Sequence, residues 1–159
     1  MFNKYISLCR RPDATAIIRG NENYPKIKGT VRFCESGNGI MVIAEITGLP
    51  ANKEFCKNSV LGFHIHEGTA CSGTPTDAFA DTKAHLNPKN CPHPNHDGDM
   101  PPLFVTDNGY AFLAFVSDRI TLNEIIGKTV VIHSASDDFK TQPSGNSGFK
   151  IACGTIKKS

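Results

Sequence analysis

The chain lacks the features that mark membrane and nucleic-acid-binding proteins. Its formal net charge is only +2, and 20% of its 159 residues are charged. No apolar run approaches the roughly 18 residues that a membrane-spanning helix needs. No basic stripe with interleaved aromatic residues is present, as a nucleic-acid-binding surface would require. We therefore expect neither a membrane nor a nucleic acid among its partners.

The six cysteines lack the spacings of redox and zinc-finger motifs. Neither CxxC nor CxC occurs, so their spacing supports neither kind of site. Cys9, Cys34, Cys56 and Cys91 are expected to be free thiols, which favours a reducing compartment. The N-terminal residues also lack the apolar segment of a secretory signal. These features predict a cytoplasmic protein, with an exported, trimmed form as the open alternative.

The hydrophobic pattern predicts an all-β protein of one domain, residues 1–159, with a short N-terminal extension at 1–13. Turn residues separate eight short runs with strand character, and one helical turn is expected near 122–126. The expected strands are 14–20, 26–34, 40–47, 60–67, 103–106, 110–116, 129–134 and 150–156. Eight strands of this kind form a sandwich or a closed barrel. Two long segments, 68–101 and 135–149, interrupt the pattern, and loops of such length are usually functional.

The six histidines are concentrated at these loops. His64 and His66 alternate on one expected strand, so both rings point to the same face, where they suit one metal ion. By itself, such a pair is also typical of the solvent face of a strand. The first long loop then supplies four nitrogen and oxygen ligands, which suit tetrahedral zinc. These four are His85, His93, His96 and Asp99.

A polar, proline-rich surface loop is the alternative for that segment. Five of the six histidines, however, fall between positions 64 and 96, and the sixth, His133, closes a strand beside the second long loop. This concentration predicts a metal site.

Six segments together resemble the Cu,Zn superoxide dismutases, and they occur in the order of that family. They are GFHIHE at 62–67, HLNP at 85–88, HDGD at 96–99, VVIH at 130–133, GNSG at 145–148 and IACG at 151–154. The resemblance implies an eight-stranded Greek-key barrel. It also implies an enzyme that disproportionates superoxide to dioxygen and hydrogen peroxide by Cu(II)/Cu(I) cycling, and a homodimer.

The resemblance also implies the ligands and their neighbours. Copper would be held by His64, His66, His85 and His133, and zinc by His85, His93, His96 and Asp99. His85 would bridge the metals as imidazolate and pass a proton to the product. Asp137 would accept hydrogen bonds from one ligand of each metal, unless it only caps its loop. Cys71 and Cys153 would form a disulfide, unless they are two buried thiols.

The sequence departs from the family pattern at two places. Lys150 stands where the family has an arginine beside copper; it keeps the positive charge but loses the planar fork, unless it is an ordinary strand lysine. The loops around His93 and after His133 are also short, which puts substrate guidance in doubt more than metal binding.

Two other functions remain as alternatives: a non-enzymatic copper or zinc binder, and a copper-delivery protein on the same barrel. The complete copper quartet argues against the first, and the absence of a cysteine transfer motif argues against the second.

Overall fold

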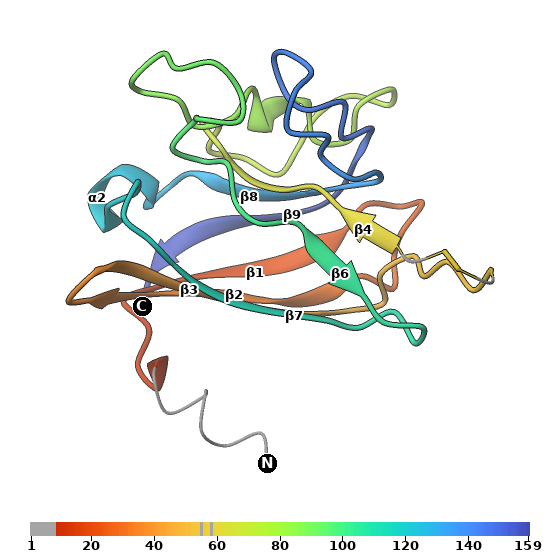
Figure 1. Ribbon diagram of the computed structural model, residues 1–159, viewed down its shortest axis with the longest axis horizontal. Coiled ribbons are helices and arrows are strands. Elements are labelled where there is room, and N and C mark those ends of the chain that lie inside the picture. Colours follow the sequence, from red (N-terminus) through yellow and green to blue (C-terminus); the bar gives the residue numbers. More distant parts are fainter. Residues whose placement is uncertain (1–8, 55, 58) are drawn as a thin grey trace.

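The computed structural model describes residues 9–54, 56–57 and 59–159 and shows a strongly curled antiparallel sheet (Figure 1). Of the predicted extension 1–13, residues 1–8 lie outside the described residues. The strands are β1 (Ala14–Gly20), β2 (Lys28–Ser36), β3 (Gly39–Thr47), β4 (Ser59–Leu61), β5 (Phe63–His66), β6 (Leu103–Val105), β7 (Ala111–Ser117), β8 (Thr129–His133) and β9 (Lys150–Lys158). Helical structure is limited here to η2 (Ala80–Thr82) and α2 (Leu122–Ile125) among the named elements.

Seven strands form one sheet in the order β5-β8-β9-β1-β2-β3-β7, and β4 pairs with β6. Side chains from these strands alternate between core and surface, as Ala14, Ala16 and Ile18 of β1 illustrate. The buried sets from the large sheet and from the β4–β6 pair merge into a single hydrophobic cluster. The all-β sandwich expected from the sequence is therefore confirmed.

The strand expected at 60–67 is divided in two at Gly62. Residues before Gly62 pair with β6, whereas those after it pair with β8. The Gly62 N–H donates to the carbonyl of Ala135 at 2.8 Å, and its own carbonyl accepts from the His133 N–H at 2.9 Å. A Cβ atom at Gly62 would lie 2.9 Å from the Cβ of Ser147. The chain thus leaves the small sheet and enters the large one at Gly62, directly before the first two histidines.

The two long loops lie together at one side of the curled sheet, at the top of Figure 1. β5 and β8 lead into them, and the short helix η2 belongs to the first. None of the helices in the described part of the chain is long and apolar enough to cross a bilayer.

Cys9 and Cys34 form a disulfide, with their Cα atoms 5.9 Å apart, so the expectation of free thiols at these two positions was wrong. The segment before β1 runs beside β2, where the Asp13 N–H donates to the carbonyl of Phe33. Both cysteines pack against Ile43 in a small buried cluster. Their separation of 25 residues carries no motif that would reveal the pairing. Cys56 and Cys91 remain unpaired in the described structure.

Burial of side chains in the core of the sheet stabilises the fold. Substitutions of a buried and an exposed isoleucine test this. Ile132 of β8 is fully buried next to His133, whereas Ile17 of β1 is 52% exposed. We expect Ile132→Ala to lower the free energy of unfolding by about 2–5 kcal/mol, because it removes buried methyl groups and leaves a cavity. The matched change Ile17→Ala should cost no more than about 0.5 kcal/mol. Urea unfolding of the metal-free, disulfide-intact proteins measures both, and equal losses would contradict the packing described here.

Candidate metal centre

β5 presents His64 and His66 to the loops. Phe63 and Ile65, the alternate residues of this four-residue strand, belong to the hydrophobic core. The period of two therefore turns both histidine rings toward the loop side of the sheet. Isolated bridges pair His64 with Asp99 and His66 with His85, so the first long loop lies directly along β5.

Four histidines converge into a first group. His64, His66, His85 and His133 each offer a ring nitrogen, and these atoms all lie within 4.8 Å of one another. The Nε2 atoms of His66 and His133 are 3.2 Å apart. His133 reaches the group from the end of β8, where the register with β9 shifts between Ile132 and His133. All four residues are buried.

A second group shares His85 with the first. His85, His93, His96 and Asp99 again bring one ligand atom each within 4.8 Å of the others. The Nδ1 atom of His85 lies 2.7 Å from one carboxylate oxygen of Asp99, and the Nδ1 atoms of His93 and His96 lie 3.1 and 3.4 Å from the other. All four members come from the loop at 68–101, as the sequence predicted for this set.

Buried ring nitrogens that have no hydrogen-bond partner among the described residues include His64 Nδ1 and His85 Nε2. Buried polar atoms are nearly always paired, so such atoms need an explanation. The Nδ1 of His85 faces Asp99 in the second group, and its Nε2 is unpaired. The ring of His85 therefore offers one nitrogen to each group. Imidazole donors suit copper and zinc, and a carboxylate also suits zinc. The residues present therefore fit both ions.

Asp137 forms a hydrogen bond with one histidine of each group. Its carboxylate accepts a hydrogen bond from His64 Nε2 at 2.7 Å and from His93 Nε2 at 2.9 Å. The Phe139 N–H also donates to it, at 2.7 Å. Because each Nε2 is occupied in this way, the Nδ1 atom of each ring is left for a ligand.

The sequence reasoning missed three supports of this arrangement. A Cβ atom at Gly145, whose φ is +70°, would lie 1.9 Å from Asp137 Oδ1, so only glycine fits there. The side chain of Gln142 accepts from the His93 N–H and donates to the His93 carbonyl. The carbonyl of Lys83 accepts from His66 Nδ1 at 2.8 Å. Gly145 lies in a GNSG segment that the resemblance singled out, whereas no sequence signal pointed to Gln142 or Lys83.

Burial keeps the histidines in the neutral form that binds metals. Desolvation lowers the pKa of His64, lowers that of His66 strongly and lowers that of His133 to about 3. Burial acts to raise the pKa of Asp137, but hydrogen bonds from His64, Phe139 and His93 outweigh it and lower that pKa. At neutral pH His64, His66 and His133 are therefore neutral and Asp137 is ionised.

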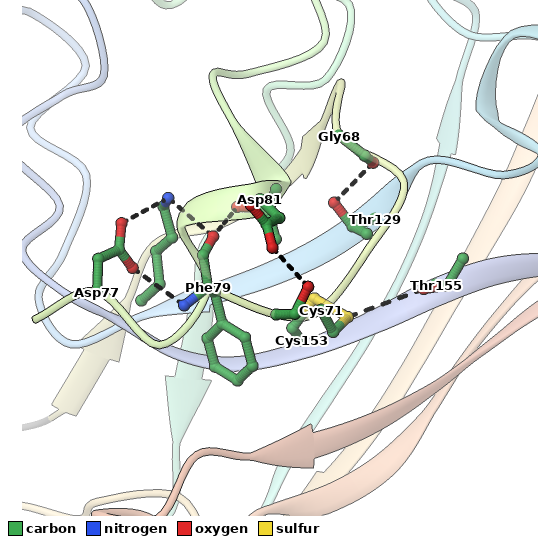
Figure 2. The surroundings of a disulfide bond; sticks show 11 residues. Gly68, Cys71, Asp77, Phe79, Asp81, Thr129, Cys153 and Thr155 are labelled. Atoms are coloured by element: carbon green, nitrogen blue, oxygen red, sulfur yellow. Dashed lines mark hydrogen bonds and ion pairs between the residues drawn. A yellow bond between two sulfur atoms is a disulfide. The ribbon is translucent and has the colours of Figure 1, made fainter. Parts of the chain in front are cut away.

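Lys150 begins β9 opposite His133 in the register of the two strands. Its side chain is only 16% exposed, and its Nζ lies 3.1 Å from Asp77 Oδ2 and 3.1 Å from the Phe79 carbonyl. Three residues further along β9, Cys153 forms a disulfide with Cys71, with Cα atoms 5.7 Å apart. Figure 2 shows how this bond and the turn carrying Asp77 and Phe79 join the first long loop to β9.

The family model described as copper/zinc superoxide dismutase (SODC) matches residues 27–156. This chain belongs to that family. Superoxide dismutase [Cu-Zn] 2 of Aquifex aeolicus is 35% identical over 146 residues, which cover 83% of this chain and 80% of that protein. Superoxide dismutase [Cu-Zn] of Legionella pneumophila is 31% identical over 160 residues, covering 96% and 92%.

A solved structure supports the fold in the same way. The Cu/Zn superoxide dismutase from Brucella abortus matches with a TM-score of 0.75 at 24% identity, over 91% of this chain and 99% of that one. The family, together with the two histidine groups, gives the protein superoxide as its substrate and copper and zinc as its cofactors. It is an oxidoreductase, and a purely metal-binding or copper-delivering protein is not favoured.

Removing the carboxylate of Asp137 is expected to weaken metal binding. Asp137→Ala leaves the Nε2 atoms of His64 and His93 without their acceptor, and losing such a support typically costs about 10–100-fold in affinity. Competition with a chelator measures the affinity for zinc and copper. Asp138→Ala is the matched control, since Asp138 is exposed and its carboxylate accepts from Lys140 and Thr141 of its own loop. Equal affinity in both variants would contradict the role of Asp137.

Metal-free protein should lose stability in mild acid. The folded-state pKa values of His64, His66 and His133 lie below the unfolded value of about 6.5, so the unfolded chain binds more protons below that pH. The free energy of unfolding should be constant above about pH 6.5 and fall as pH drops toward 5, with a limiting slope of about 1.4 kcal/mol per pH unit for each proton taken up on unfolding. Urea unfolding at pH 7, 6 and 5 tests this, and a flat profile would refute it.

Proposed function

We propose that this superoxide dismutase holds copper on the first group (His64, His66, His85 and His133) and zinc on the second (His85, His93, His96 and Asp99). The main support for this proposal is the ring of His85. Its Nδ1 faces Asp99, and its unpaired Nε2 is available to the other histidines of the first group. When bound, copper supplies the one-electron Cu(II)/Cu(I) couple, and zinc supplies fixed positive charge.

In the reaction, two superoxide ions and two protons give dioxygen and hydrogen peroxide. Several residues of the chain have separate roles in it. His85 holds a proton at Nε2 in one half of the cycle and donates it to the peroxide in the other. Asp137 fixes the orientation of His64 and His93. The ammonium of Lys150, the cation that β9 places opposite His133, attracts the anion. The disulfide between Cys71 and Cys153 holds the first long loop against this strand.

Metal analysis and a superoxide assay test this assignment. We expect one copper and one zinc per chain, and dismutation that cyanide blocks. Lys150→Ala should keep both metals and reduce the rate constant by about tenfold at low ionic strength, because a steering charge next to the site is lost. Lys140→Ala, which removes an exposed lysine of the second long loop, should change it little. Full activity of Lys150→Ala would contradict the proposed role of Lys150 but would leave the assignment of the metal ligands unchanged.

The homodimer and the compartment also remain proposals. Exposed Phe104 of β6 and Phe112 and Val116 of β7 offer apolar surface for a second copy of the chain. Two disulfides persist best in an oxidising environment, which favours the exported alternative over the predicted cytoplasmic location.

A further inference from the structure

Two oxygen atoms of the turn at 74–80 contact the ammonium of Lys150. Asp77 Oδ2 and the Phe79 carbonyl both lie 3.1 Å from Lys150 Nζ. The other carboxylate oxygen, Oδ1, accepts from the Phe79 N–H at 3.1 Å. Figure 2 shows Asp77 and Phe79 side by side in this turn. Both oxygens of the Asp77 carboxylate are thus occupied, one by the backbone of the turn and one by Lys150.

The position of the Asp77 carboxylate is fixed by the turn itself. The Asp77 N–H donates to Thr74 Oγ1, and the Asp77 carbonyl accepts from the N–H groups of Thr74 and Ala80. The Phe79 ring is buried with Cys71, Val131 and Cys153, so the turn is also fastened to the sheet. The pairing with Lys150 therefore does not depend on a freely moving acidic side chain.

This geometry has two consequences for a passing anion. An ammonium has three donors, and two of them point to Asp77 and Phe79, which leaves one for a ligand. The negative charge of Asp77 also offsets the positive charge of Lys150 at close range. Because the Asp77 side chain is 43% exposed, solvent screens this pair only in part. The groove beside the pair is lined by Asp77, Lys150 and Phe149, so it is open to small solutes.

We propose that Asp77 is a positioning residue that holds the Lys150 ammonium against the turn at 74–80 and at the same time restrains its attraction for anions. The proposal rests on the anion-attracting role of Lys150 proposed above. Asp77 does not touch the metal groups described here; it acts through Lys150.

Replacing the charge while keeping the shape separates the two effects. In Asp77→Asn the offsetting charge is gone, and the single amide oxygen that faces Lys150 keeps that hydrogen bond at the expense of the one from the Phe79 N–H. We expect the dismutation rate constant at low ionic strength to rise about threefold, and its decrease with added salt to become steeper. Asp77→Glu, which keeps the charge, should stay close to the parent rate. Asp81→Asn is the matched control, since Asp81 belongs to the same loop and bonds to Ser72.

The double variant Asp77→Asn, Lys150→Ala should be no faster than Lys150→Ala alone. A rise of the same size in Asp77→Asn and Asp81→Asn, or a rise that persists without Lys150, would overturn the proposal, because the effect would then be one of net charge.

Anion binding to zinc-only, copper-free protein gives a readout that is independent of activity. Inorganic phosphate is titrated while the side-chain NMR signals of ¹³C-labelled lysine are followed. We expect the Kd at Lys150 to fall about threefold in Asp77→Asn relative to the parent protein and to Asp81→Asn. An unchanged Kd in Asp77→Asn would overturn the proposal. If the copper-loaded enzyme failed to dismutate superoxide, the proposed function would fall, whereas this titration would still decide whether Asp77 restrains Lys150.

Discussion

The hydrogen bonds from His64 and His93 to Asp137 decide what the histidine cluster can do. Each ring has two nitrogens, and the carboxylate occupies the Nε2 of both. The Nδ1 atom of His64 remains buried and unpaired among the described residues, and that of His93 faces Asp99. Burial and the nearby imidazoles lower the pKa of His66 and His133, so these two rings are neutral at neutral pH. One ionised carboxylate behind the cluster thus orients a ring in each group and supplies negative charge where two cations are to bind.

The fold contributes by bringing three distant segments to that carboxylate. The chain changes sheets at Gly62, which places His64 on β5 next to His133 at the end of β8. The first long loop runs along β5 through the bridges at Asp99 and His85. The second long loop carries Asp137, and Gly145 in that loop allows it to approach His93. The sheet therefore supports the site through β5 and the end of β8, while its core stabilises the fold.

The sequence predicted the all-β fold, the strand positions and the metal-binding character of the loops, because period-two patterns and ligand types are local signals. It did not predict that 60–67 divides at Gly62, since that break depends on Ala135 and Ser147 from a distant loop. The Cys9–Cys34 disulfide was missed for the same reason: only the course of the chain beside β2 brings the two residues together. The ion pair between Lys150 and Asp77 could not be predicted either, because Asp77 is one of several acidic residues in a loop that has no periodic pattern.

Because His85 belongs to both groups, the binding of an ion at one group is coupled to the binding of an ion at the other. A ring whose Nδ1 is held on one side has fewer orientations to lose when its Nε2 is engaged on the other. Any change that binding at the second group makes in the affinity of the first is therefore matched, by reciprocity, by the same factor in the opposite direction of loading. The order of loading consequently does not change the total binding free energy, and the affinity of either group depends on whether the other is filled.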